Sequence, residues 1–155
     1  MDDESAVKRV LIVDDDEQVR SLLSTVLRKD GIQTFEADCA EEALGILKRC
    51  KDQNISVLII DLSLPGMDGA SLCRRMRRTE PLKVTIAMTG YTDLFTICEC
   101  REAGFDDYFG KPISVPVVRA AMLSAFKRAR YWETIARSSY LERSKKKTPN
   151  GSGIL

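Results

Sequence analysis

The sequence of 155 residues contains no histidine, and its five cysteines are never spaced as Cys-x-x-Cys. Without an imidazole, Ser-His-Asp and Cys-His catalysis are excluded, as are zinc sites that use histidine ligands. An odd number of cysteines in this pattern also argues against a disulfide framework. We therefore expect the thiols, including the pair in Cys98-Glu99-Cys100, to pack as ordinary side chains.

Long hydrophobic runs are also missing from the sequence. No window approaches the roughly 18 consecutive apolar residues that a membrane-spanning helix needs. The first residues, Met1-Asp2-Asp3-Glu4, are acidic and lack the basic and apolar regions of a secretory signal. With 44% apolar and 30% charged residues, the composition is typical of one soluble domain. These features predict a cytoplasmic protein.

Charge is unevenly distributed along the chain. From Lys127 to the end there are eight basic and two acidic residues, a net charge of +6. Residues 1–126 carry 16 basic and 21 acidic residues, a net charge of −5. An acidic body followed by a basic tail indicates two functional parts.

Short apolar runs alternate with segments whose apolar residues recur at helical spacing. The predicted strands are residues 10–13, 33–37, 57–60, 84–88 and 107–109. The predicted helices are residues 19–27, 40–50, 70–78, 93–103 and a last one from about Ser114 past Phe126. Asp16 and Asp93 suit helix N-caps, and Gly31 suits a helix stop. Strict alternation of this kind predicts an α/β fold, a parallel sheet with helices on both faces.

Polar side chains follow the predicted strands where each strand ends. They are the carboxylates of Asp14, Asp15 and Asp61, the hydroxyl of Thr89 and the ammonium group of Lys111. The carboxyl ends of parallel strands meet at one edge of the sheet, so these groups should converge there. Two carboxylates about 4 Å apart repel each other by roughly 4 kcal/mol at an effective dielectric constant near 20. Such a cluster needs a cation, and oxygen ligands favour Mg²⁺.

Four motifs in this region resemble the receiver domain of two-component response regulators. They are Leu-Ile-Val-Asp-Asp at residues 11–15, Ile-Ile-Asp-Leu-Ser-Leu-Pro-Gly-Met-Asp-Gly at 59–69, Met-Thr-Gly at 88–90 and Tyr-Phe-Gly-Lys-Pro at 108–112. The resemblance covers about residues 7–127. It implies a doubly wound, flavodoxin-like sheet of five parallel strands in the order 2-1-3-4-5. A receiver domain at residues 1–127 would precede a tail, residues 128–155, made of an extended helix and a basic end. The low-complexity composition of residues 144–153, with three lysines, one proline and two glycines, predicts that this end is disordered.

The resemblance also implies a role for each residue at the sheet edge. Asp61 would be the nucleophile and the site of phosphorylation. Asp15, Asp61 and the backbone carbonyl of Ser63 would hold Mg²⁺, with Asp14 assisting through a water molecule. Lys111 would neutralise charge on the phosphoryl oxygens.

Further family features concern switching and partners. Thr89 would donate its hydroxyl to the phosphoryl group, and Tyr108 would turn inward in response. The surface that changes would comprise the helix beginning near Asp93, the strand at Tyr108 and the last helix. A histidine kinase or histidine phosphotransfer protein would supply the phosphoryl group, so the chain would be a phosphoacceptor switch rather than a turnover enzyme.

Two alternatives stay open at this point. The Asp-x-Asp pair of Asp14 and Asp16 fits a haloacid-dehalogenase-like phosphatase, although Gln18 stands where Thr or Val is expected. A receiver fold could also serve only as a non-phosphorylated dimerisation module. Such modules usually lack one of the functional groups that this sequence contains.

The last predicted helix extends beyond a minimal receiver. Apolar residues recur there with a 3.5-residue repeat, which permits a seam between two helices. They are Val118, Met122, Ala125, Ala129, Trp132 and Ala136. Either the helix joins two protomers in a homodimer, or it frays. Nothing after Phe126 is long enough for the usual DNA-binding output domain, so the chain is a stand-alone receiver or the receiver part of a longer protein.

Overall fold

Five parallel strands form a single sheet in the computed structural model, which describes residues 6–91 and 93–147. The strands are β1 (Arg9–Val13), β2 (Gln33–Ala37), β3 (Val57–Asp61), β4 (Val84–Thr89) and β5 (Asp107–Gly110). Their order is β2-β1-β3-β4-β5, and in this register Leu11 pairs with Phe35 on one side and Leu58 on the other. The predicted doubly wound sheet and its strand order are confirmed.

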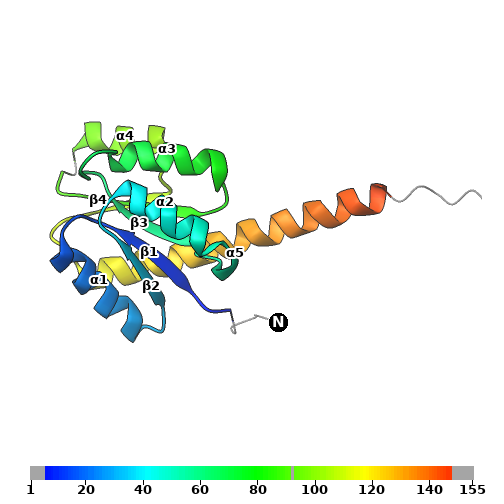
Figure 1. The fold of residues 1–155 in the computed structure, drawn as a ribbon, viewed down its shortest axis with the longest axis horizontal. Coiled ribbons are helices and arrows are strands. Elements are labelled where there is room, and N and C mark those ends of the chain that lie inside the picture. The colour runs from blue at the N-terminus through cyan, green and yellow to red at the C-terminus, as the bar shows by residue number, and fades with distance from the viewer. Residues whose placement is uncertain (1–5, 92, 148–155) are drawn as a thin grey trace, which may run out of the picture.

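Helices cover both faces of the sheet (Figure 1). They are α1 (Glu17–Lys29), α2 (Ala40–Arg49), α3 (Gly69–Thr79), α4 (Leu94–Ala103) and α5 (Val115–Lys146), with a short 3-10 helix, η1 (Lys51–Gln53). Alternating residues of β1 supply the two cores: Leu11 packs with α2, α3 and α4, while Ile12 packs with α1 and α5. All four β1 residues from Val10 to Val13 are fully buried, which explains why the strand has no polar face.

Local signals in the sequence explain where the helices begin and end. The Asp16 side chain accepts a hydrogen bond from the Gln18 backbone N–H at 2.8 Å, and Asp93 caps α4 in the same way through Thr96. Gly31 follows the end of α1 with φ of 78°, a left-handed conformation that favours glycine. All three predicted helix boundaries are confirmed.

The helix α5 is long, and its two parts differ in their surroundings. Its first part lies against the sheet through Val118, Met122, Ala125 and Ala129, all buried in the core. Its later turns project away from the body (Figure 1). The first four positions of the 3.5-residue repeat are therefore occupied by packing within the chain. Only Trp132 and Ala136 of that repeat extend beyond this contact.

The helical part of the tail is longer than its composition suggests. Ser144, Lys145 and Lys146, whose composition predicts disorder, form the end of α5, and Lys147 is its C-cap residue. Adding residues to an existing helix avoids the cost of a new helical nucleus, and Glu142 and Lys146 are spaced for an attractive i,i+4 pair. Residues 148–155, the rest of the predicted disordered end, lie outside the described residues.

None of the helices within residues 6–91 and 93–147 has the length and apolar character required to cross a membrane.

Truncation of the tail tests the predicted domain boundary at residue 127. Ending the chain after Thr134 should leave the thermal unfolding midpoint nearly unchanged, because the buried positions of α5 stop at Ala129. Ending it after Lys127 should lower the free energy of unfolding by about 1–2 kcal/mol, because that also removes the buried Ala129 and the ion pair of Arg128 with Asp106. Thermal unfolding followed by circular dichroism measures both. Equal destabilisation by the two truncations would contradict this division of α5.

Candidate functional site

An ammonium group bridges two buried carboxylates at the carboxyl edge of the sheet. The Lys111 Nζ atom lies 2.9 Å from Asp14 Oδ2 and 3.1 Å from Asp61 Oδ2. Asp14 is fully buried and Asp61 is 5% exposed, whereas 27% of the Lys111 side chain is exposed. The prediction that these three strand-end residues converge is confirmed by these distances.

Backbone contacts hold both carboxylates in place. Asp61 is the last residue of β3, and its Oδ1 atom accepts a hydrogen bond from the Ser63 backbone N–H at 3.2 Å. Asp14 follows β1 directly, and its Oδ1 atom accepts from the Asp16 backbone N–H at 2.9 Å. A Cβ atom at Gly69 would lie 2.2 Å from the Asp61 carbonyl oxygen, so only glycine allows α3 to begin this close to β3.

Asp14 and Asp61 place two negative charges close together in this cluster, so a third negative charge there is unfavourable. Burial raises the pKa of Asp61 and the charge of Asp14 raises it further, while Lys111 and the Ser63 N–H offset part of this effect. Partial burial lowers the pKa of Lys111, but its hydrogen bonds to Asp14 and Asp61 outweigh burial and raise that pKa overall. Lys111 therefore stays charged near neutral pH.

Three carboxylates at this edge are close enough to share a metal ion. Asp14, Asp15 and Asp61 each offer an oxygen atom within 4.8 Å of the others. Lys111 contributes one positive charge against three negative charges, so a divalent cation would restore the balance. Oxygen donors of this kind fit Mg²⁺. Asp16 lies outside the group and caps α1 instead.

Neither of the two predicted switch residues, Thr89 and Tyr108, makes a described hydrogen bond to the cluster. The Thr89 hydroxyl donates to the Tyr91 carbonyl at 2.9 Å and accepts from the Tyr91 N–H at 3.0 Å. Tyr108 is 39% exposed on β5. Thr89 therefore stands at the carboxyl end of β4, as predicted, with its hydroxyl occupied by its own loop.

A cleft of about 160 Å³ opens beside the Thr89 side chain. Its lining comes from the β3–α3 loop, the start of α3, the end of β4, the β4–α4 loop and α4. The residues are Leu62, Ser63, Asp68, Ala70, Thr89, Tyr91, Thr96 and Glu99. This cleft gives the Thr89 hydroxyl space for another orientation.

Sequence reasoning missed one residue that shapes this edge. The Arg20 guanidinium group donates to the Asp14 backbone carbonyl at 2.8 Å and lies 3.9 Å from Glu36 Oε1. It thereby ties α1 to the turn that carries Asp14 and Asp15. Arg20 lies one helical turn after the predicted cap Asp16, and this spacing was the available signal.

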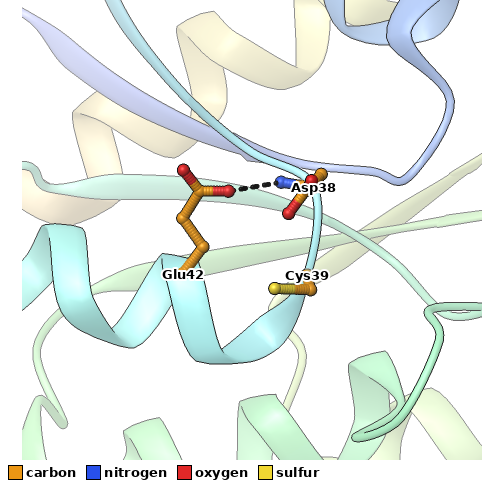
Figure 2. A group of neighbouring side chains, drawn as sticks. All are labelled: Asp38, Cys39 and Glu42. Atoms are coloured by element: carbon orange, nitrogen blue, oxygen red, sulfur yellow. Dashed lines mark hydrogen bonds between the residues drawn. The ribbon is translucent and has the colours of Figure 1, made fainter.

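A second group of possible metal-ligand side chains, two carboxylates and a thiol, lies at the start of α2. Figure 2 shows Asp38, Cys39 and Glu42, which offer ligand atoms within 4.8 Å of one another. The Glu42 Oε2 atom accepts a hydrogen bond from the Asp38 backbone N–H at 3.2 Å, which closes the first turn of the helix. A backbone hydrogen bond at Glu42 lowers the pKa of the Cys39 thiol, but burial and nearby carboxylates raise it overall. This contact accounts for the positions of Asp38 and Glu42, whereas the side chain of the N-cap residue, Cys39, makes no capping hydrogen bond.

A family model and several curated proteins match most of this chain. The family model described as "Response regulator receiver domain" matches residues 10–123. Sporulation initiation phosphotransferase F of Bacillus subtilis is 35% identical over 115 residues, which cover 74% of this chain and 90% of that protein. A cyclic di-GMP phosphodiesterase of Thermotoga maritima is 31% identical over 138 residues, which cover 89% of this chain and 36% of that protein. This chain spans about half or less of the length of several curated relatives.

Solved structures are similar to this chain over most of its length. A CheY-like response regulator receiver domain protein from Methanospirillum hungatei superposes with a TM-score of 0.69 at 26% identity, over 83% of this chain and 98% of that chain. A response regulator receiver domain protein from Clostridium thermocellum superposes with a TM-score of 0.74 at 24% identity, which reports on the fold alone.

Proposed function

Because this chain belongs to the receiver domain family of two-component response regulators, we propose that it accepts a phosphoryl group on Asp61 and switches its surface in response. The observation that carries the proposal is the Lys111 ammonium group, which bridges Asp14 and Asp61 at the carboxyl edge of the sheet. The donor is a partner histidine kinase or histidine phosphotransfer protein, since this chain contains no histidine.

The transfer follows from the placement of these groups. One Asp61 carboxylate oxygen attacks the phosphorus atom, a bond to phosphorus forms, and the bond from phosphorus to the donor nitrogen breaks with its electron pair. Lys111 holds a phosphoryl oxygen as a point charge. Asp15, Asp61 and the Ser63 carbonyl would hold Mg²⁺, and Asp14 would assist through a water molecule. When bound, Mg²⁺ neutralises charge on the phosphoryl oxygens.

The response is a shift between two packings of the same chain. The Thr89 hydroxyl leaves Tyr91 for a phosphoryl oxygen, and Tyr108 turns inward from its exposed position. The surface formed by α4, β5 and α5 then differs between the two states. The phosphoryl group is later lost to water, so the chain is a timed switch rather than a turnover enzyme.

The partners and location proposed here follow the same family. The chain acts in the cytoplasm, receives the phosphoryl group from its kinase or phosphotransfer partner, and forms a homodimer through α5.

Phosphoryl acceptance by the wild-type chain tests this function. Incubation with acetyl phosphate and Mg²⁺ should add one phosphoryl group, and the same incubation with EDTA should add none, because the carboxylate cluster then lacks its cation. Intact-protein mass spectrometry measures the product. If neither acetyl phosphate nor a promiscuous histidine kinase adds a phosphoryl group, the non-phosphorylated dimerisation module replaces this proposal.

A further inference from the structure

Arg20 lies near the start of α1 and contacts the turn that carries two of the proposed metal ligands. Its guanidinium Nη1 atom donates to the Asp14 backbone carbonyl at 2.8 Å, and its backbone N–H donates to the Asp16 carbonyl at 3.1 Å. The side chain is only 17% exposed. The proposed transfer of a phosphoryl group assigns no role to this arginine.

The three carboxylates of the metal group are held to different degrees. The side chains of Asp14 and Asp61 each accept one hydrogen bond from the Lys111 ammonium group and one from a backbone N–H. Within the described part of the chain, no hydrogen bond or ion pair holds the exposed Asp15 carboxylate. An Asp15 oxygen nevertheless lies within 4.8 Å of oxygen atoms of the other two carboxylates. The placement of the Asp15 side chain therefore depends on its backbone.

The backbone next to Asp15 is fixed by the contact with Arg20. The Asp14 carbonyl belongs to the peptide group that joins Asp14 to Asp15. A peptide group is planar, so a hydrogen bond to its oxygen atom fixes the plane from which Asp15 continues. The preceding peptide group is fixed separately, because the Asp14 N–H donates to the Ala37 carbonyl of β2 at 3.1 Å. The direction of the Asp15 side chain therefore depends on Arg20.

We propose that Arg20 is a positioning residue for the divalent cation. By holding the Asp14–Asp15 peptide group, it keeps the Asp15 carboxylate directed toward Asp14 and Asp61. This inference rests on the proposed function, because it concerns the cation that phosphoryl transfer requires. Binding of the cation alone tests it, without a phosphoryl donor.

The charge of Arg20 by itself would act in the opposite direction. A guanidinium group beside the cluster repels a divalent cation, so removal of that charge alone would strengthen binding. Glu36 limits this repulsion, since its Oε1 atom lies 3.9 Å from Arg20 Nε. Loss of an outer partner that orients a metal ligand typically weakens metal binding by about 10- to 100-fold. Position and charge therefore predict changes of opposite sign when Arg20 is replaced.

Binding of Mn²⁺ to the full chain tests the proposal. Mn²⁺ takes the same oxygen ligands as Mg²⁺, and the electron paramagnetic resonance signal of free Mn²⁺ reports the bound fraction. Arg20→Met keeps an apolar stem and removes both the donor and the charge. Its dissociation constant for Mn²⁺ should be about tenfold higher than that of the wild type. An equal or lower dissociation constant would overturn the inference.

Arg20→Lys tests whether the hydrogen bond is the contact that matters. A lysine keeps the charge and can donate to the Asp14 carbonyl, because Arg20 uses a single N–H there. Its dissociation constant for Mn²⁺ should stay within about threefold of the wild-type value. Both variants should fold, because Leu23 and Leu27 hold α1 in the core, and circular dichroism checks this. A folded Arg20→Lys chain that binds as weakly as Arg20→Met would contradict the proposed contact.

A double-mutant cycle tests whether Arg20 acts through Asp15. Asp15→Asn should itself raise the dissociation constant for Mn²⁺, because it removes a charged ligand. In the Asp15→Asn chain, Arg20→Met should add less than about a threefold further change, since the carboxylate that Arg20 positions is already gone. If the two effects simply multiply, Arg20 does not act through Asp15 and the inference fails.

Arg28→Met is the matched control for Arg20→Met. Arg28 is also an arginine of α1 whose side chain contacts β2, because its Nε atom donates to Thr34 Oγ1 at 2.8 Å. It lies eight residues after Arg20, about 12 Å further along the helix. Arg28→Met should bind Mn²⁺ as the wild type does. If it weakened binding as much as Arg20→Met, a general loosening of α1 would replace the positioning role.

Phosphoryl transfer should show the same effect as a change in the Mg²⁺ requirement. With acetyl phosphate, Arg20→Met should need about tenfold more Mg²⁺ for half-maximal phosphorylation and should reach the wild-type rate at saturating Mg²⁺. A lower rate at saturation with an unchanged Mg²⁺ requirement would contradict positioning of the cation.

Failure of the proposed function is recognised separately. A wild-type chain that binds Mn²⁺, loses affinity on Arg20→Met and never gains a phosphoryl group would contradict phosphoryl acceptance and support the role of Arg20. A wild-type chain that gains a phosphoryl group while Arg20→Met binds Mn²⁺ unchanged would contradict the role of Arg20 alone.

Discussion

Asp61→Asn is expected to abolish phosphoryl addition completely and to raise the free energy of unfolding. An amide oxygen does not attack phosphorus, and asparagine has nearly the shape of aspartate, so the loss should be chemical rather than structural. The mutant also removes one of the two charges that face each other across Lys111, those of Asp14 and Asp61. Intact-protein mass after incubation with acetyl phosphate and Mg²⁺ measures the first effect.

The gain in stability should depend on pH in a defined direction. Burial and the charge of Asp14 raise the pKa of Asp61 above its ordinary value of 3.8, so ionised Asp61 destabilises the folded chain. This penalty is absent below that ordinary value and fully present above the raised pKa. The free energy of unfolding of Asp61→Asn should therefore exceed that of the wild type near pH 7 by roughly 1–2 kcal/mol. This difference should vanish below about pH 4.

Asp16→Asn is the matched control for this substitution. Asp16 lies in the β1–α1 turn but caps α1 rather than joining the cluster, and asparagine caps helices as well as aspartate does. Its phosphoryl addition and stability should both resemble those of the wild type. A phosphoryl group that still appears on the Asp61→Asn chain would show that the acceptor is another residue.

The position of the site could be predicted because its chemistry lies at the ends of strands. Asp14, Asp61 and Lys111 come from segments up to 97 residues apart. Asp14 follows the apolar run of β1 and Asp61 ends that of β3, whereas Lys111 follows the short strand β5, in which only Phe109 is buried. In a parallel sheet the ends of such runs meet, so convergence follows from topology without any knowledge of side-chain geometry.

Interactions that depend on side-chain direction could not be predicted in the same way. The Thr89 hydroxyl bonds to Tyr91 through torsion angles that no residue pattern encodes. The spacing of Arg20 one helical turn after Asp16 places it near the β1–α1 turn, but does not indicate that its side chain reaches the Asp14 carbonyl. The periodicity of α5 was ambiguous for a different reason. A helix packed on its own sheet and a helix packed on a second helix share nearly the same repeat, and the buried Ala129 shows where the sheet accounts for it.

Lys111→Ala is expected to destabilise the chain and to separate phosphorylation from switching. The ammonium group neutralises Asp14 and Asp61, and these carboxylates raise its pKa. While its partners are ionised, Lys111 stabilises the folded state below its ordinary pKa of 10.5, and this stabilisation is lost as the pH rises through the raised value. Its removal should lower the free energy of unfolding near pH 7 by about 1–3 kcal/mol, less than for a fully buried pair because 27% of the side chain is exposed. Chemical denaturation measures this loss.

The interaction with Asp61 can be isolated within the same series. Part of the destabilisation should disappear in the double mutant Lys111→Ala/Asp61→Asn, because only one of the two carboxylates then lacks its cation. Mg²⁺ should also reduce it, since a divalent cation replaces the missing charge. If the two substitutions were additive, Lys111 would not be neutralising Asp61.

The functional consequence of Lys111→Ala concerns the link between the phosphoryl group and the surface. Asp61 keeps its carboxylate, so acetyl phosphate should still add a phosphoryl group. Without the ammonium group on a phosphoryl oxygen, the protection of residues 93–110 against amide hydrogen exchange should no longer change on phosphorylation. Lys83→Ala is the control, because Lys83 is also a partly buried lysine but donates to the Ile55 carbonyl at the opposite edge of the sheet. It should lose stability and keep the exchange response, whereas a wild-type response in phosphorylated Lys111→Ala would remove Lys111 from the switch.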